Sequence, residues 1–221
     1  MMMNRMMRGR AVVATVSAVS AVLVVSACGG SKPAEVPPPI QSTAPVAEEK
    51  AAPAPEPERP AVVVADFATG DRKNALGGEF GAWQHEAKSS EEVVAGAGAD
   101  KTGAWKITYD ITPPGSFSGA YMKLANLDAS SAKNFVISVK GEGDFSPDFI
   151  LELKTGEGAA QKTGRHVIKG VTKEYRKIEI PLTSFAGLME FKPLSELAIV
   201  FDEQTCPVKT GTYYIDTIEF Q

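Results

Sequence analysis

The chain has 221 residues, of which 43% are hydrophobic and 23% are charged, and its formal net charge is −4. Proteins that bind nucleic acids need clustered Lys and Arg to displace counterions, whereas the basic residues here are scattered among acids. The composition therefore argues against a nucleic-acid partner.

The first 27 residues have the order of a secretory signal. Arg5, Arg8 and Arg10 supply a basic start, residues 11–24 are apolar, and small residues lead to Cys28. The alternative is a transmembrane helix, but an apolar run of about 15 residues is shorter than the roughly 20 that span a bilayer. We therefore predict that residues 1–27 are a signal peptide.

The run Val25-Ser26-Ala27-Cys28 resembles the bacterial lipobox. This resemblance implies that Cys28 becomes the first residue and carries lipid, including palmitate-type acyl chains, which tether the protein to a bilayer of the cell envelope. Two or more acyl chains give stable anchoring where one does not. Gly29 stands where an Asp would favour retention at the inner membrane of enteric bacteria, which implies the outer membrane, on its periplasmic or surface side. Cleavage would remove three Arg and no acid, which leaves a net charge of about −7.

Residues 28–60 are dominated by Pro, Ala and Glu, as in the run Pro37-Pro38-Pro39. Proline fixes φ and lacks an N–H, and this composition cannot build a core. We predict a disordered, extended linker between the lipid and a folded domain. A proline motif that binds a partner's groove is the alternative interpretation.

Residues 61–221 show the pattern of one all-β domain. Short runs rich in β-branched and aromatic residues recur at intervals of about ten residues and are separated by turn residues, which is typical of an antiparallel β-sandwich. The predicted strands are Val62–Phe67, Glu92–Ala95, Trp105–Ile111, Gly119–Leu124, Phe135–Val139, Phe149–Lys154, Arg165–Lys169, Tyr175–Ile180, Leu197–Phe201 and Thr212–Phe220.

Alternation along these strands predicts which side chains face the core. Trp105 and Tyr109 share parity with isoleucines and should be buried, whereas Tyr121 is out of phase with its apolar neighbours and should be exposed. Cys206 is the only cysteine besides Cys28, so lipidation of Cys28 would leave no partner for an intramolecular disulfide. We expect Cys206 to be an inert, packed thiol; a reactive or intermolecular thiol is the alternative.

Four segments in chain order carry a family resemblance. They are Val64-Ala65-Asp66-Phe67 followed by Gly70-Asp71 and Asn74-Ala75-Leu76-Gly77-Gly78; Ser138-Val139-Lys140-Gly141; the run from Tyr175 to Phe185; and the run from Gly211 to Phe220. Together they resemble the galactose-binding-like jelly roll of carbohydrate-binding module family 11 and the related complex I intermediate-associated protein 30 domain. The resemblance implies a jelly-roll sandwich that lays a polysaccharide along one face.

Sugar recognition combines aromatic platforms for the apolar faces of sugar rings with fixed polar groups for the hydroxyls. The predicted glycan-binding residues are Trp83, Tyr121, Lys123, Glu152, Lys154 and Tyr175. Trp83 is expected in a loop after the Gly77-Gly78 turn, and it could instead close one end of the core.

A structural Ca²⁺ is a further expectation. Asp216 shares parity with Tyr214, Ile218 and Phe220, and an unpaired buried carboxylate needs a cation or hydrogen-bond donors. The resemblance implies that the first and last strands lie together, which brings Asp66 toward Asp216, with Asp71 in the adjoining loop. Calcium takes six to eight oxygen ligands. The alternative is an Asp that is hydrogen-bonded at a bulge.

The sequence favours a non-catalytic protein. It has no nucleophile elbow, no phosphate-cradling loop and no Cys/His metal spacing, and of its two histidines, His166 shares strand parity with Ile168 and is expected to be packed. The leading interpretation is a membrane-anchored carbohydrate-binding lipoprotein. The alternative is an assembly or interaction lipoprotein that binds a protein partner on the same scaffold.

Overall fold

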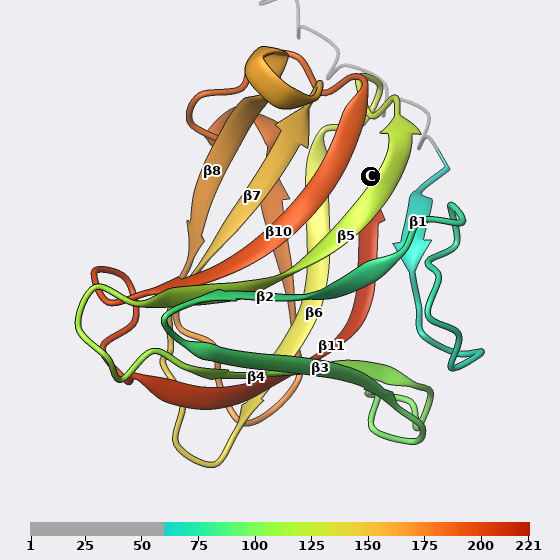
Figure 1. The fold of residues 1–221 in the computed structure, drawn as a ribbon. Helices are drawn as coiled ribbons and strands as arrows, with labels where there is room; N and C mark the ends of the chain where they lie inside the picture. Colours follow the sequence, from blue (N-terminus) through green and yellow to red (C-terminus); the bar gives the residue numbers. More distant parts are fainter. Residues whose placement is uncertain (1–59) are drawn as a thin grey trace, which may run out of the picture. The chain divides into compact units, whose positions relative to one another are not determined.

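A computed structural model describes residues 60–221. The predicted signal peptide (1–27), Cys28 and the linker up to residue 59 lie outside the described residues. The described chain forms two antiparallel β-sheets packed face to face (Figure 1), which confirms the predicted all-β sandwich. None of its helical segments has the length and apolarity required to cross a membrane.

Each sheet mixes strands from distant parts of the chain. The five-stranded sheet has the order β2 (Phe80–His85), β5 (Phe117–Leu127), β10 (Leu194–Asp202), β7 (Phe149–Thr155) and β8 (Lys162–Ile168). The six-stranded sheet has the order β3 (Lys88–Val94), β4 (Ala104–Asp110), β11 (Thr210–Phe220), β6 (Asn134–Glu142) and β9 (Arg176–Pro181), with β1 (Val62–Ala65) also paired to β11. Two short 3-10 turns, η1 (Gly158–Ala160) and η2 (Leu182–Ser184), lie in the connections.

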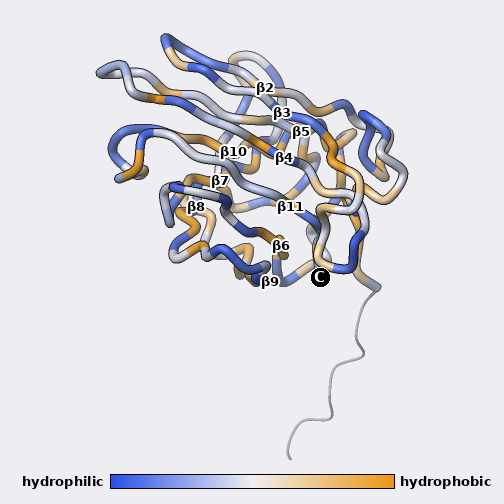
Figure 2. The backbone as a smooth tube through the Cα atoms, turned by 90° about the horizontal axis from the view of Figure 1, so that it is seen from below, coloured by the Kyte–Doolittle hydropathy of each residue, from blue (hydrophilic) through white to orange (hydrophobic). Residues whose placement is uncertain are grey.

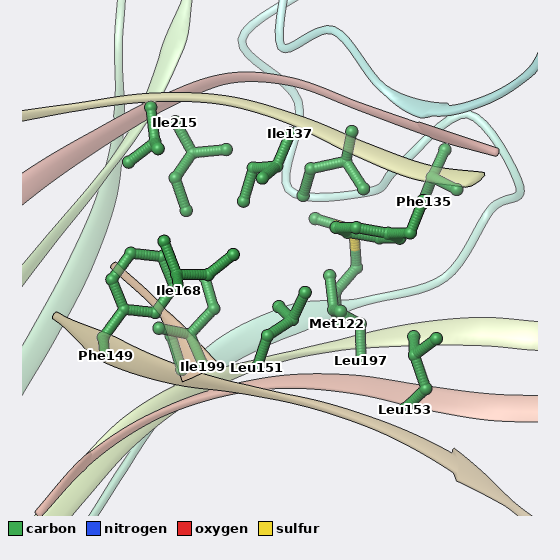
Figure 3. Packing of buried hydrophobic residues seen from close by; sticks show 14 of the residues in the cluster. Met122, Phe135, Ile137, Phe149, Leu151, Leu153, Ile168, Leu197, Ile199 and Ile215 are labelled. Carbon is green, nitrogen blue, oxygen red and sulfur yellow. The ribbon is translucent and has the colours of Figure 1, made fainter. Parts of the chain in front are cut away.

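The hydrophobic core fills the space between the two sheets. In Figure 3, Met122, Leu151 and Leu197 of the five-stranded sheet point toward Phe135 and Ile137 of the six-stranded sheet. Figure 2 shows hydrophobic stretches along the strands and mostly hydrophilic turns at their ends. Burial of these side chains is the main term that stabilises such a domain.

The predicted core aromatics are buried as expected. Trp105 is 0% exposed and Tyr109 is 1% exposed. Tyr109 stacks on Phe201 with their ring centroids 4.2 Å apart, so an aromatic contact joins β4 of one sheet to β10 of the other. The parity assignment in these strands is therefore confirmed.

The sequence analysis missed one strand and predicted the start of another several residues too far along the chain. β2 was not predicted, and β3 begins at Lys88 rather than at Glu92. Both segments contain small or polar residues, such as Gly81 and Ser89-Ser90, which have weak intrinsic strand preference. Their conformation comes from pairing with β5 and β4 in the folded sheets.

Candidate functional site

The outer face of the five-stranded sheet, meaning the face turned away from the core, carries five of the six predicted glycan-binding residues. Tyr121 and Lys123 on β5, and Glu152 and Lys154 on β7, alternate with core residues and therefore point outward. β10 runs between these strands, and its Ala198 is in register with Tyr121 on one side and Glu152 on the other. The fold thus gathers residues about 30 positions apart onto one surface.

Trp83 is the fifth of these residues, and its predicted location in a loop was wrong. It lies in β2, where it is in register with Gly119 of β5. It does not belong to the hydrophobic core cluster and is half-buried on the outer face. The edge strand β2 therefore places the indole beside the side chains of β5.

Two glycines allow these aromatic rings to lie against the sheet. A side-chain carbon added to Gly81 would stand 3.0 Å from Oη of Tyr121, and one added to Gly119 would stand 2.8 Å from Cζ2 of Trp83. Each ring therefore crosses the neighbouring strand at the glycine with which it is in register. Such aromatic–glycine pairs restore packing where the strand lacks a side chain.

Phe117 and His85 extend the aromatic surface, and the sequence analysis did not identify either as a site residue. Phe117 is 39% exposed, and its ring centroid lies 5.8 Å from that of Trp83 in a T-shaped arrangement. The His85 ring stacks on Phe117 at 4.8 Å. Phe117 has the same strand parity as Tyr121, which was the signal that could have revealed it.

A charged cluster lies beside the aromatic residues, and its centre is Glu196 of β10, another residue that the sequence analysis missed. Lys123 donates to one Glu196 oxygen at 2.6 Å and Lys154 donates to the other at 2.8 Å. Burial alone raises the pKa of the Glu196 carboxyl, but the hydrogen bonds from the two lysines outweigh burial and hold that pKa below its ordinary value. Glu196 is therefore a stable carboxylate near neutral pH.

A hollow of about 400 Å³ adjoins Phe117 on the same face. Its lining includes Glu152, Arg165 and Asp202, and Arg165 donates to Asp202 at 3.0 Å. The face therefore offers aromatic rings on β2 and β5 and hydrogen-bonding charged groups on β7, β8 and β10. This combination can bind a ligand that has both apolar faces and many hydroxyl groups.

The loop before β2 is fixed to β5 by Asn74. The Asn74 amide donates to the carbonyl oxygen of Lys123 at 2.7 Å, and its side-chain oxygen accepts hydrogen bonds from the N–H groups of Leu76 and Gly78. Asn74 is only 7% exposed. This buried amide thus holds the loop and the start of β2 against the strand that carries Tyr121 and Lys123.

Tyr175 lies apart from the other predicted glycan-binding residues. It immediately precedes β9 of the six-stranded sheet, and its hydroxyl donates to the carbonyl of Ala97 at 2.7 Å. The ammonium of Lys140 lies 4.8 Å from the Tyr175 ring centroid, and burial raises the pKa of the Tyr175 hydroxyl. The structure does not bring Tyr175 into the outer face of the five-stranded sheet.

The predicted calcium ligands are only partly brought together. β1 pairs with β11, as expected for the first and last strands, but Asp66 and Asp71 are exposed, and Asp66 accepts a hydrogen bond from the N–H of Ala68. Within residues 60–221, no group of three or more acidic, His or Cys side chains could hold a metal ion. A calcium ion bound through fewer carboxylates and loop carbonyls stays a prediction.

The parity assigned to Asp216 was wrong in one respect. The pairing of β11 with β6 shifts register between Ile215 and Thr217, so Asp216 occupies a β-bulge. This extra residue changes the phase of the strand, and Ile218 and Phe220 therefore face the core while Asp216 does not. Asp216 is 9% exposed and accepts a hydrogen bond from Thr102 at 3.1 Å. This arrangement matches the alternative prediction, an Asp that is hydrogen-bonded at a bulge.

His166 and Cys206 are packed, as predicted. The His166 ring lies 5.7 Å from the Phe185 ring, and its Nδ1 is 3.4 Å from the carbonyl oxygen of Ser184. Cys206 is 0% exposed, and burial raises the pKa of its thiol. A thiol with a raised pKa is a poor nucleophile at neutral pH.

The comparisons with known proteins show a relationship in structure only. No protein-family profile matches the chain, and no curated protein matches it in sequence. The family 11 carbohydrate-binding module from Clostridium thermocellum, solved with a β-1,3-1,4-mixed-linked tetrasaccharide, superposes with a TM-score of 0.57 at 16% identity, covering 72% of this chain and 94% of that module.

A second module of this kind has the same architecture. The family 30 carbohydrate-binding module of a cellulosomal cellulase of Clostridium thermocellum superposes with a TM-score of 0.55 at 12% identity, covering 74% of this chain and 98% of that module. The resemblance inferred from the sequence is thereby confirmed at the level of the fold. Residues 60–221 have the jelly-roll β-sandwich fold of the family 11 and family 30 carbohydrate-binding modules.

Proposed function

We propose that this domain is a non-catalytic module that binds a polysaccharide across the outer face of the five-stranded sheet. The observation that carries the proposal is the pair of rings, Trp83 and Tyr121, lying against the sheet beside the charged cluster of Lys123, Glu196 and Lys154. Flat aromatic surfaces stack on the C–H faces of sugar rings, and the neighbouring charged groups donate to and accept from hydroxyls.

The fold supports this assignment. A structural neighbour of the same fold holds a β-1,3-1,4-mixed-linked tetrasaccharide, so this scaffold is compatible with an extended glycan. An extended glycan needs contacts at regular intervals along its length. The sheet provides them, because neighbouring strands lie about 4.8 Å apart and each presents side chains on the same face. A chain of sugar units can therefore meet several strands in succession.

A glycan array tests the proposal. The purified full-length protein is applied to β-glucans, galactans and bacterial cell-wall glycans, once with Ca²⁺ and once with EDTA. Saturable binding to at least one polysaccharide supports the proposal, and binding that EDTA removes would support the predicted calcium site. An absence of binding to every glycan would contradict the proposal and favour the alternative of a protein-interaction scaffold.

Gly81→Ala should weaken glycan binding without unfolding the domain. The three atoms nearest to the added methyl group would all belong to the Tyr121 side chain, at 3.0–3.2 Å, so this side chain must lift from the sheet by a few tenths of an ångström. We expect a loss of about 1 kcal/mol, roughly fivefold in Kd, measured by titration calorimetry. In a Tyr121→Ala background the same change should have no further effect, and an equal loss there would show that Gly81 does not act through the ring.

We also propose that the protein is a lipoprotein anchored through Cys28, with the linker holding the module away from an outer membrane. The support is the order of residues 1–28 and the presence of Gly29 after the cysteine. In a bacterial host, mass spectrometry of the mature N-terminus should find lipidated Cys28, and Cys28→Ala should prevent lipidation. Mature protein that begins elsewhere, or an unmodified Cys28, would contradict this proposal.

A further inference from the structure

The outward-pointing charges of the five-stranded sheet are paired with one another. Glu196 of β10 is in register with Lys123 of β5 on one side and with Lys154 of β7 on the other. One carboxylate therefore bridges two ammonium groups, at 2.6 Å and 2.8 Å. The central position of β10 makes this bridge a direct consequence of the strand order.

The remaining charged side chains on the outer face also form ion pairs. Glu152 lies 3.9 Å from Lys154, and Arg165 lies 3.0 Å from Asp202. The outward-pointing strand residues thus comprise three cations and three carboxylates, and every cation has a carboxylate partner. The strand residues of this face carry no net charge although it is rich in charged groups.

The ion pair between Glu196 and Lys154 is partly shielded from solvent, whereas the Lys123 side chain is 54% exposed. The Glu196 side chain is 15% exposed and the Lys154 side chain is 19% exposed. Partly buried pairs are screened less by salt than exposed ones, and both oxygens of Glu196 already accept a hydrogen bond from an ammonium group. The Glu196 carboxylate offsets part of the positive charge of both lysines, so an incoming carboxylate gains less attraction from them than it would from unpaired lysines.

We propose that Glu196 makes this face selective for uncharged polysaccharides by neutralising Lys123 and Lys154. The inference rests on the proposed function and names its ligand class. A glycan that carries carboxylates would meet three carboxylates and, among the outward-pointing strand residues of this face, no cation that lacks a carboxylate partner. Such like-charge contacts disfavour a charged ligand. The hydroxyls of a neutral glycan can share the lysine and carboxylate groups without breaking the pairs.

The test uses two forms of one polymer, a mixed-linked β-glucan and its carboxymethylated derivative, which share a backbone and differ in charge. Glu196→Gln keeps the side-chain shape and removes the charge that binds both lysines. We expect its affinity for the carboxymethylated polymer to rise roughly tenfold at low salt, and the gain to disappear at about 0.5 M salt, where the Debye length is only a few ångströms. Because Glu196 also belongs to the proposed binding site, the affinity of this variant for the unmodified polymer should not rise, so the ratio of its two affinities should shift toward the carboxymethylated polymer.

The matched control is Glu190→Gln, which makes the same change of net charge at an exposed position outside this sheet; it should not alter binding to either polymer. Glu152→Gln is a second variant, which should give a smaller gain in affinity for the carboxymethylated polymer because Glu152 is farther from Lys154 than Glu196 is.

The inference is overturned if the unaltered protein binds both polymers equally, or if neither Glu196→Gln nor Glu152→Gln gains affinity for the carboxymethylated polymer. If the unaltered protein binds no neutral glycan on the array, the proposed function itself fails.

Discussion

Trp83→Ala and Tyr121→Ala should each weaken polysaccharide binding by about 2 kcal/mol, or about thirtyfold in Kd. Both rings lie against glycines of the neighbouring strand, so they are held in place before the ligand arrives and lose little entropy on binding. Aromatic residues in such positions commonly dominate the energy of an interface. Titration calorimetry with the polysaccharide identified on the array measures the loss.

The controls separate the role of the rings from a role in stability. Because both side chains lie outside the core cluster, the melting temperature of each variant should stay within about 2 °C of the parent. Tyr121→Phe keeps the ring and should retain most of the affinity. Tyr175→Ala removes an aromatic residue that adjoins the six-stranded sheet, so a loss as large as that of Tyr121→Ala would contradict the assignment of the binding face.

Gly78→Ala should destabilise the domain by about 3 kcal/mol. A side-chain carbon at this position would stand 2.0 Å from the carbonyl oxygen of Lys123, so the backbone itself must move. That movement would break the Asn74 hydrogen bonds to Gly78 and Lys123 and leave buried polar groups unsatisfied. For a domain of this size the expected fall in melting temperature is about 6–12 °C.

Gly77→Ala is the matched control for this prediction. Gly77 has a φ of +79°, but nothing lies within 4 Å of an added side-chain carbon. Its cost should therefore be about 1 kcal/mol, from backbone strain alone. Equal destabilisation by the two variants, measured by thermal or denaturant unfolding, would show that the close approach of Gly78 to β5 is not what the loop requires.

The fold could be predicted from the sequence because most strands alternate cleanly. Trp105 and Tyr109 lie in a strand whose inward residues are all large and apolar, and such periodicity depends only on local sequence. β2 could not be found in this way. Gly81 lies on its outer face, and Gln84, which has the parity of the buried Phe80, is polar and exposed. Its strand conformation therefore depends on pairing with β5, which is separated from it by the whole of β3 and β4.

The parity rule failed at Asp216 for a physical reason. A β-bulge adds one residue to a strand without adding a pair, and nothing in the local sequence of β11 indicates where the extra residue falls. The reversal of phase is visible only in the register of β11 against β6. An acidic residue with the same parity as apolar residues was the available signal. The sequence analysis interpreted it as a calcium ligand, with a hydrogen-bonded Asp at a bulge as the alternative.

The candidate site was predicted in part, and the missing part depends on sheet topology. Tyr121, Lys123, Glu152 and Lys154 could be identified as outward-facing from their own strands. Glu196 could not be singled out, since its role comes from the position of β10 between β5 and β7. Strand order of this kind is a property of the whole chain, and no local pattern encodes it.

The central claim is that a polysaccharide binds across the outer face of the five-stranded sheet. The most direct test is to map the backbone amide NMR shifts of the protein while it is titrated with a mixed-linked β-glucan oligosaccharide. The predicted result is that the largest shifts occur in β2, β5, β7 and β10, around Trp83, Tyr121 and Glu196. Saturable shifts confined to β3, β4 and β11, or to the surroundings of Tyr175, would place the ligand on the other sheet and contradict the account.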